Sequence, residues 1–234
     1  MQIFYAPDIR IGKYILDKNE SKHAVRALRM AKGDELVVVD GDGCLYEGII
    51  TDPDPICCEI SVRSITRNFE KRGYRLHIAI SPVKNHERFE WFVEKSVEIG
   101  IDEITPVICR YTEKPAIKSE RLENIIISSM KQSIKAFKPV LNEPVSFNEF
   151  VSAGNNDIKM IAHCHSELER SKIEDVCEKN RNVVILIGPE GDFSDEEINL
   201  ATHHGFSPVH LGKSRLRTET AGIAACNSVY FINQ

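Results

Sequence analysis

The stretch from Ile187 to Ile198, IGPEGDFSDEEI, decides how the second half of the chain folds. An apolar run that starts at Val183 predicts a buried strand, and this run stops at Gly-Pro-Glu-Gly. Ser194 and Glu197 then form the Ser-x-x-Glu pattern of a helix N-terminus. The sequence therefore predicts a buried strand that turns directly into a capped helix.

A turn of this kind lies where parallel sheets bind ligands, in the crevice beyond the carboxyl ends of the strands. Gly188 and Gly191 permit positive φ and a close approach of the backbone, and Pro189 stiffens the turn. The free N–H groups of the helix after Ser194 would face an anionic group. A tight turn that holds no ligand is the alternative interpretation of this stretch.

From Arg75 onward the pattern alternates apolar strands with helices. The third helix follows a second capping pattern, Ser166-x-x-Glu169. The alternation predicts an α/β domain, residues 71–234, with a parallel sheet covered on both faces. We expect strands at residues 76–80, 104–109, 159–164, 183–188 and 208–212, and helices at residues 87–99, 120–137, 167–179, 195–204 and 218–231.

Residues 1–70 show short β-type runs instead, such as ELVVVD at 35–40 and CLYEGII at 44–50. One short helix is expected near residues 22–30. We interpret this part as a small, mostly β domain, with a barrel as the expected architecture.

Charge is distributed unevenly along the chain, which has 234 residues and a formal net charge of −5. Seven Lys or Arg and two acids lie between Arg10 and Lys32, whereas eight acids and no base lie between Gly33 and Glu59. A mildly acidic protein can still carry one basic patch that selects its partner. The alternative is a solvated face without a partner.

The seven cysteines form no Cys-x-x-Cys pair, and their odd number argues against a disulfide framework and a zinc site. No apolar run reaches the length of a membrane span, so no membrane partner is expected. The first ten residues lack a basic stretch followed by an apolar one. We therefore expect a cytoplasmic protein.

A second glycine turn, LGKSRLRTETAG, follows the strand at 208–212. Two adjacent strands that end in glycine loops indicate one shared pocket. The stretch lacks the dinucleotide pattern G-x-G-x-x-G, and Ser207 stands where a phosphate-binding P-loop needs its first glycine. His163 and His165 share a strand face, but they are better explained as a polar strand end than as a metal site. No G-x-S-x-G nucleophile motif occurs.

The two glycine turns together, LIGPEGDFSDEEI and LGKSRLRTETAGIAA, resemble the SPOUT methyltransferases. More narrowly, they resemble the 16S rRNA uridine-N3 methyltransferases, ribosomal RNA small subunit methyltransferase E. EKSVEIGIDEITPVI (94–108), MKQSIKAFKP (130–139) and HAVRALRMAKGDEL (23–36) are similar to further segments of that family. The resemblance thus covers nearly the whole chain.

The resemblance implies a C-terminal SPOUT α/β trefoil-knot domain and a small N-terminal PUA-like β-barrel domain that binds RNA. It also implies S-adenosyl-L-methionine as the cofactor, 16S rRNA of the small ribosomal subunit as the substrate, and a homodimer. Knotted chains are rare, and nothing in the hydrophobic pattern predicts one.

Site residues follow from the same resemblance. Arg217 is the first candidate to stabilise the negative charge of a deprotonated uracil, with Arg215 second and Glu219 as a residue that orients Arg217. The phosphate-contacting residues would be Arg10, Lys13, Lys22, Arg26, Arg29 and Lys32. The cofactor-binding residues would be Ile187, Gly188, Pro189, Glu190, Gly191, Leu211, Gly212, Leu216, Thr220 and Ala221, with Glu190 either at a ribose hydroxyl or as a loop anchor.

Four positions depart from the family's pattern: Asp192 replaces a glycine, Lys131 replaces a glutamate, Lys135 replaces an arginine, and Tyr111 stands near an expected arginine. The Asp192 substitution leaves room for a non-catalytic RNA-binding protein with a degenerate knot. A SPOUT enzyme that acts on another RNA is a further alternative. A metabolic α/β enzyme would leave the basic N-terminal segment unexplained.

Overall fold

A computed structural model describes residues 3–154, 157–165 and 167–234. The chain divides into two compact units. The N-terminal unit comprises Met1–Lys71 and Ile127–Lys138, and the C-terminal unit comprises Arg72–Ile126 and Pro139–Gln234. Among the described residues, no helix has the length and apolarity needed to cross a membrane.

The N-terminal unit is built on a five-stranded sheet in the order β1-β3-β4-β5-β2. Only the β1–β3 pair is parallel. Side chains of the inner face, among them Phe4, Leu16, Ile50 and Ile60, form one hydrophobic core. The elements are β1 (Ile3–Tyr5), β2 (Gly12–Ile15), α1 (Lys18–Lys22), the π-helix η1 (His23–Ala27), β3 (Glu35–Val39), β4 (Cys44–Asp52) and β5 (Glu59–Arg67).

The helical segment of this unit begins where its sequence allows. The Asp17 carboxylate accepts hydrogen bonds from the N–H groups of Asn19 and Glu20, which caps α1. Glu20 also pairs with Lys131 at 2.6 Å. Lys131, which replaces a glutamate of the family pattern, therefore has the buried Glu20 as its ionic partner within the same unit.

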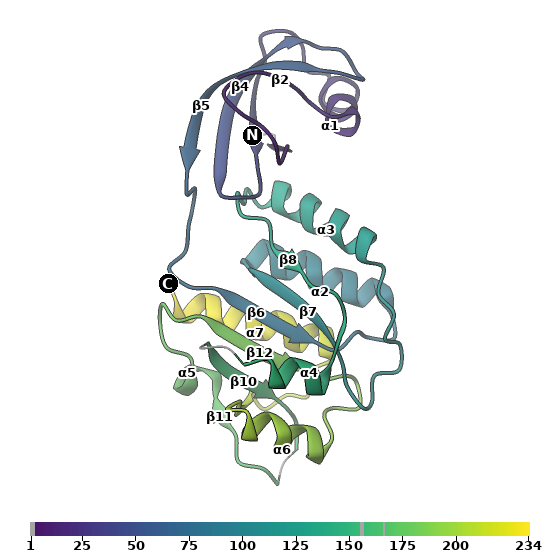
Figure 1. The fold of residues 1–234 in the computed structure, drawn as a ribbon, viewed down its shortest axis with the longest axis vertical. Coiled ribbons are helices and arrows are strands. Elements are labelled where there is room, and N and C mark those ends of the chain that lie inside the picture. The colour runs from purple at the N-terminus through teal and green to yellow at the C-terminus, as the bar shows by residue number, and fades with distance from the viewer. Residues whose placement is uncertain (1–2, 155–156, 166) are drawn as a thin grey trace. The chain divides into compact units, whose positions relative to one another are not determined.

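The C-terminal unit contains a parallel sheet in the order β11-β13-β10-β12-β6-β7-β8, with β9 paired to β7 (Figure 1). Its strands are β6 (Leu76–Ile80), β7 (Glu103–Ile108), β8 (Val140–Leu141), β9 (Val145–Ser146), β10 (Ile158–Ala162), β11 (Ser171–Lys172), β12 (Val183–Ile187) and β13 (Ser207–His210). Its helices are α2 (His86–Ile99), the first part of α3 (Ser119–Gln132), α4 (Phe147–Ser152), α5 (Ile173–Val176), α6 (Asp195–His203) and α7 (Thr218–Ile232).

Helices cover both faces of this sheet (Figure 1). α2 and α7 pack on each other and α7 contacts β6 and β12, whereas α4 and α6 meet on the other face. Because successive residues of a strand point to opposite faces, Ala79 joins the core under α4 and α6 while Ile80 lies against α7. All five residues of β12 are buried, as a central parallel strand requires.

Two predicted helices differ from the structure. The helix expected at 120–137 ends at Gln132, because Ile134 takes a left-handed conformation with φ 58° and Lys135 N–H closes onto Met130 O. The helix expected at 167–179 is reduced to the four residues of α5. Its predicted cap, Ser166, lies outside the described residues.

The last connection of the chain fixes the position of the site. β13 neighbours β10 at one side of the sheet, but α7 packs on β6, β12 and α2. The segment between β13 and α7 therefore crosses the carboxyl ends of β10 and β12. The trefoil knot implied by the resemblance stays a prediction.

Candidate functional site

A pocket lies where the carboxyl ends of β10 and β12 meet the start of α7. Its volume is about 310 Å³. We name it the carboxyl-edge pocket. It is lined by Ala162, Cys164, Ile187, Gly188, Pro189, Glu190, Asp192, Arg215, Leu216, Arg217, Thr218 and Ala221. Both glycine turns contribute to it, so the shared pocket predicted from the sequence is present.

The turn after β12 is closed by a hydrogen bond from Asp192 N–H to Pro189 O at 2.9 Å. Neither Gly188 nor Gly191 has a positive φ, contrary to the expectation from the sequence. Both serve close packing instead: a Cβ on Gly188 would lie 3.1 Å from the Phe193 ring, and a Cβ on Gly191 would lie 3.1 Å from Cβ of Tyr111.

Positive φ occurs one residue later, at Asp192 with φ 65°. Aspartate is among the residues that best tolerate this left-handed region, so it can replace the family's glycine. Its two carboxylate oxygens accept hydrogen bonds from Cys164 N–H at 2.7 Å and Phe193 N–H at 2.8 Å. The carboxylate thus ties the turn to the end of β10.

Glu190 is exposed and lines the carboxyl-edge pocket. Its Oε1 accepts a hydrogen bond from Lys84 N–H at 3.0 Å. This contact links the turn to the segment between β6 and α2, which is the loop-anchoring role.

The second turn follows β13 and bends at Gly212, which has φ 109°. Arg215 and Arg217 from this turn are exposed and line the pocket. Neither guanidinium forms an ion pair with a described residue. Both are therefore available to a negatively charged group in the pocket.

The helix that presents its N-terminus to the pocket is α7, because no residue of α6 lines it. At α6 the Ser194 hydroxyl accepts from Glu197 N–H and the Glu197 carboxylate accepts from Ser194 N–H, so the capping box satisfies two of the N-terminal N–H groups. At α7 the N-cap residue is Arg217, whose side chain makes no capping hydrogen bond. Thr218, the first residue of α7, lines the pocket. The expected anion site after Ser194 is thus corrected to the start of α7.

Three of the predicted residues line neither this pocket nor the hollow that continues it. Gly191 packs on Tyr111, and Thr220 is half-buried in the first turn of α7. Glu219 is buried and its Oε1 lies 3.8 Å from Nε of Arg88 in α2. Its ionic partner in the structure is therefore Arg88, and this pair joins α7 to α2.

A hollow continuous with the carboxyl-edge pocket accounts for Leu211 and Gly212. The two spaces share Ala162, Cys164, Leu216 and Ala221. We name the extension the His163 hollow, and it is lined additionally by His163, Arg170, His210, Leu211, Gly212 and Ser214.

His163 and His165 diverge at the end of β10. His165 has its Nδ1 3.0 Å from an Asp195 carboxylate oxygen and its Nε2 2.9 Å from Phe193 O. His163 is 4% exposed, and burial lowers the pKa of its imidazole to about 4. His163 is therefore a neutral ring at neutral pH.

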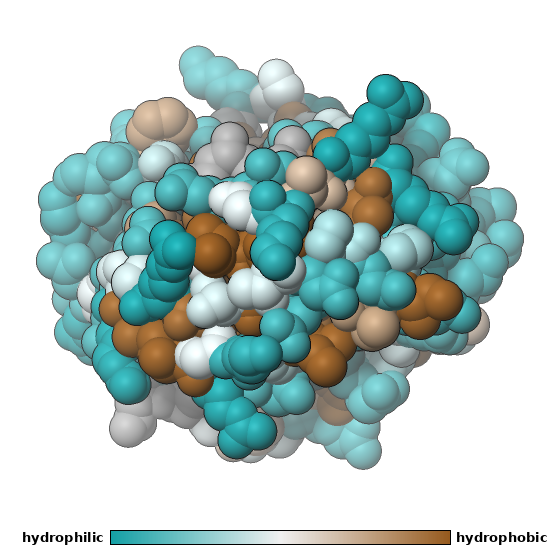
Figure 2. Space-filling view, turned by 90° about the horizontal axis from the view of Figure 1, so that it is seen from above, coloured by the Kyte–Doolittle hydropathy of each residue, from teal (hydrophilic) through white to brown (hydrophobic). Residues whose placement is uncertain are grey.

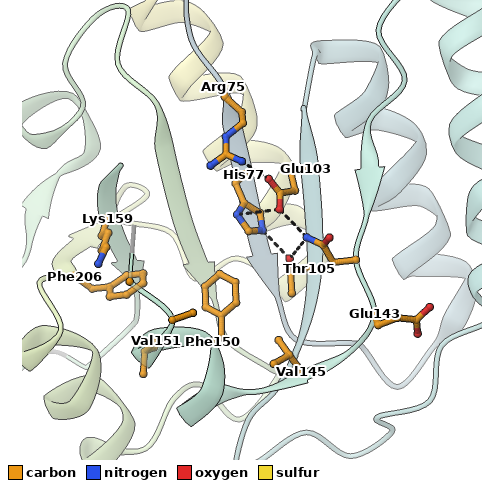
Figure 3. A pocket seen from close by; sticks show the side chains of 13 residues that line it. Arg75, His77, Glu103, Thr105, Glu143, Val145, Phe150, Val151, Lys159 and Phe206 are labelled. Atoms are coloured by element: carbon orange, nitrogen blue, oxygen red, sulfur yellow. Dashed lines mark hydrogen bonds and ion pairs between the residues drawn. The ribbon is translucent and has the colours of Figure 1, made fainter. Parts of the chain in front are cut away.

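A second cavity of about 320 Å³ lies near the amino ends of the strands (Figure 3). Its polar groups satisfy one another: Arg75 pairs with Glu103 at 2.6 Å, and His77 Nε2 and the Asn142 amide each lie 2.7 Å from the Thr105 hydroxyl. We name it the His77 cavity. This network explains the burial of His77, and the position at the wrong end of a parallel sheet disfavours a ligand site.

The six predicted phosphate-contacting residues all belong to the N-terminal unit and are exposed. Lys13 is partly neutralised by Glu59 at 3.3 Å. The face shown in Figure 2 is largely hydrophilic, with hydrophobic side chains in separate spots. Lys13 lies between two exposed apolar side chains, Ile11 just before β2 and Ile15 at its end, which are 54% and 58% exposed.

The sequence interpretation missed four lining residues, Ala162, Cys164, Asp192 and Thr218. For Ala162 and Cys164 the sequence did contain a signal, namely the strand predicted at 159–164. The carboxyl end of this strand had to lie at the same sheet edge as the glycine turn.

Comparisons with known proteins place this fold and site in a class. A family model described as RNA methyltransferase domain matches residues 70–230, and one described as RNA methyltransferase PUA domain matches residues 16–62. The pocket at the carboxyl edge of a SPOUT-like parallel sheet, together with a PUA-like unit, therefore defines an RNA methyltransferase.

Individual relatives narrow the class. Ribosomal RNA small subunit methyltransferase E of Mesomycoplasma hyopneumoniae (strain 232) is 33% identical over 77% of this chain and 81% of its own length. The crystal structure of a probable rRNA-methyltransferase from Porphyromonas gingivalis is 40% identical, with a TM-score of 0.94 over 100% of this chain and 98% of that one. Ribosomal RNA small subunit methyltransferase E from Neisseria gonorrhoeae, crystallised with S-adenosyl methionine, is 26% identical, with a TM-score of 0.91 over 100% and 98%. This chain belongs to the ribosomal RNA small subunit methyltransferase E family.

Proposed function

We propose that the protein transfers a methyl group from S-adenosyl-L-methionine to N3 of a specific uridine in 16S rRNA of the small ribosomal subunit. The observation that carries the proposal is the carboxyl-edge pocket. It combines two unpaired arginines, the start of α7 and a continuous hollow with apolar side chains in one space.

The residues of the pocket fit the proposed cofactor part by part. Uncapped N–H groups at the start of α7 suit a carboxylate. The side chains of Leu211, Leu216 and Ala221 suit a flat, weakly polar ring. When bound, the cofactor supplies a methyl group on a positively charged sulfur.

Arg217 and Arg215 perform the electrostatic part of the reaction. N3 of uracil must lose a proton before it attacks, and the negative charge then spreads over the imide. A guanidinium fixed at the pocket stabilises that charge. Arg217 is the better placed, because its backbone is held as the N-cap of α7, where Ala221 N–H donates to Arg217 O at 2.7 Å.

The N-terminal unit supplies the RNA contact. N3 lies on the Watson–Crick edge, so the target base must be unpaired or extruded. Arg26 lies in η1, and Arg29 follows it with φ 55°. Reversal of both charges, Arg26→Glu with Arg29→Glu, should weaken binding to small subunits at least tenfold and leave cofactor affinity unchanged. The matched control is Arg63→Glu, because Arg63 is an exposed arginine of β5 in the same unit and lies outside the predicted set.

We also propose a cytoplasmic homodimer. Two exposed aromatic residues support the dimer: Trp91 on α2 is 45% exposed and Phe231 on α7 is 65% exposed, and these two helices pack together. Each of the two helices thus exposes a large apolar side chain that a partner subunit would cover. Light scattering should give twice the chain mass for the wild type and a smaller mass for Trp91→Glu with Phe231→Glu.

The non-catalytic alternative loses its main support in the structure. It depended on Asp192 in place of a glycine, but Asp192 takes the left-handed conformation and anchors the turn through two hydrogen bonds.

The test is methyl transfer from labelled S-adenosyl-L-methionine to small ribosomal subunits that lack the modification, with the nucleosides resolved by mass spectrometry. We expect 3-methyluridine in 16S rRNA. Label in another RNA would replace the proposed substrate, and bound cofactor without any product in ribosomal or transfer RNA would contradict an enzyme.

A further inference from the structure

His163 carries an unusual polar atom. Its side chain is 4% exposed, and its Nε2 is buried without a hydrogen-bond partner among the residues that the structure describes. A buried polar group that stays unpaired costs free energy, so such an atom is rare unless a ligand completes it.

The tautomer of His163 follows from its neighbours. Nδ1 accepts a hydrogen bond from the backbone N–H of His165 at 3.3 Å and is therefore unprotonated. Burial lowers the pKa of the ring to about 4, so the ring carries a single proton at neutral pH. That proton is on Nε2. The unpaired atom is thus an N–H donor that needs an acceptor.

Two polar groups near His163 are engaged elsewhere. Its carbonyl oxygen accepts a hydrogen bond from Nη1 of Arg170 at 2.7 Å, which fixes the strand end. Asp192, the nearest acid, accepts its hydrogen bonds from the backbone of Cys164 and Phe193. Nothing in the described structure therefore competes for the Nε2 proton.

The place of His163 selects the chemistry of the acceptor. The His163 hollow is lined by the apolar side chains of Ala162, Leu211, Leu216 and Ala221. The charged residue in its lining, Arg170, is held by its hydrogen bond to His163 O, whereas Arg215 and Arg217 lie in the carboxyl-edge pocket. A charged carboxylate would bind more favourably in the carboxyl-edge pocket, beside Arg215, Arg217 and the start of α7. A purine ring is flat and weakly polar, and its ring nitrogens accept hydrogen bonds.

We propose that His163 donates its Nε2 proton to a ring nitrogen of the cofactor's adenine and so selects an adenine nucleoside. The inference rests on the proposed function, because it assigns a contact within the same cofactor site. His163 is a specificity-determining residue, and it takes no part in the transfer of the methyl group.

Calorimetry with S-adenosylhomocysteine and its 1-deaza, 3-deaza and 7-deaza analogues tests the proposal. His163→Phe keeps a ring but removes the donor, and His163→Gln returns an N–H group. We expect His163→Phe to bind S-adenosylhomocysteine about tenfold more weakly than the wild type, and His163→Gln to recover most of the loss. One deaza analogue, the one that lacks the contacted nitrogen, should bind the wild type about tenfold more weakly than S-adenosylhomocysteine does. The same analogue should bind His163→Phe as tightly as S-adenosylhomocysteine does.

The proposal is overturned if His163→Phe binds S-adenosylhomocysteine as tightly as the wild type does. It is also overturned if every deaza analogue loses the same factor in affinity, relative to S-adenosylhomocysteine, in the wild type and in His163→Phe. Wild type that binds no S-adenosylhomocysteine would overturn the proposed function and this contact with it, whereas tight binding with no effect at His163 would overturn the contact alone.

A measurement on the unaltered protein avoids the folding of the variants. Nitrogen-15 spectra of labelled histidine should show the His163 proton on Nε2. S-adenosylhomocysteine should then slow the exchange of that proton with water at least tenfold. A proton on Nδ1, or unchanged exchange at saturation, would contradict the proposal.

Discussion

Gly222 lies in α7 directly after Ala221 and one turn after Thr218, two residues that line the carboxyl-edge pocket. A Cβ at this position would lie 2.5 Å from Cε2 and 2.7 Å from Cδ2 of Phe92, and 3.0 Å from Cδ1 of Ile80. Phe92 and Ile80 are both fully buried, so neither side chain has open space to enter. Gly222→Ala should therefore push α7 away from α2 and β6.

The two opposing effects of Gly222→Ala have different sizes. Alanine stabilises a helix interior by about 1 kcal/mol relative to glycine. Overpacking of a well-packed core costs about 1–3 kcal/mol, and contacts this short correspond to the upper end. The expected net loss is about 2 kcal/mol in the free energy of unfolding. For a chain of this size the melting temperature of the C-terminal unit should fall by roughly 4–8 °C.

The same displacement reaches the site, because Thr218 and Ala221 line the pocket from the same helix. We expect the affinity for S-adenosylhomocysteine to fall about tenfold, measured by calorimetry below the new melting temperature. Asn227→Ala is the matched control. Asn227 is exposed in α7, so this change adds helix propensity without a clash.

A second variant isolates the contact with Phe92. In the double variant Gly222→Ala with Phe92→Leu, the smaller side chain makes room, so the combined loss should be smaller than the sum of the two single losses. The reasoning is refuted if Gly222→Ala is as stable as the wild type, or if the two losses simply add.

Three further predictions follow from the site. Arg217→Ala should lower kcat at least 100-fold and change S-adenosylhomocysteine affinity less than threefold; wild-type turnover with intact binding would remove Arg217 from the mechanism. Asp192→Ala should lower both cofactor affinity and the melting temperature, because alanine disfavours the left-handed conformation and cannot accept the two backbone hydrogen bonds, whereas Asp192→Asn should lose less; equal losses would contradict this. The pKa of His163 is lowered from 6.5 to about 4, so between these pH values the imidazole binds a second proton in the unfolded chain but not in the folded one. His163 should thus contribute about 2 kcal/mol to the fall in the free energy of unfolding between pH 7 and pH 5, so the fall should be smaller in His163→Gln by about this amount; urea titrations with identical pH slopes would exclude His163 as a cause.

The sheet and the shared pocket could be predicted because they depend on local signals. The apolar run at 183–187 and the two glycine turns mark the strand ends, and parallel strands place those ends at one edge. The capping pattern at Ser194 likewise predicted the start of α6 correctly.

The errors in the helices arose from long-range packing. The helix expected at 120–137 was extended too far, because the chain leaves α3 earlier, with Ile134 in a left-handed conformation that is unusual for a β-branched residue. The stretch 167–179 contains few apolar residues that can be buried, and Leu168 remains 37% exposed. A capping pattern therefore could not make it a helix.

Details of the site were missed for a similar reason. The contact of Asp192 with Cys164 and the pair of Glu219 with Arg88 join residues that are distant in sequence. The role of Asp192 also needed the backbone conformation, because the same residue in a right-handed turn would leave the end of β10 unsupported.

The central claim is that the carboxyl-edge pocket holds the methyl donor, although the His77 cavity has almost the same volume, about 320 Å³ against 310 Å³. A crystal structure of the protein with S-adenosylhomocysteine tests it most directly. We predict the adenine in the His163 hollow, the carboxylate at the start of α7 and the sulfur on the side of Arg217. Cofactor density in the His77 cavity, or at a surface away from both glycine turns, would contradict the account.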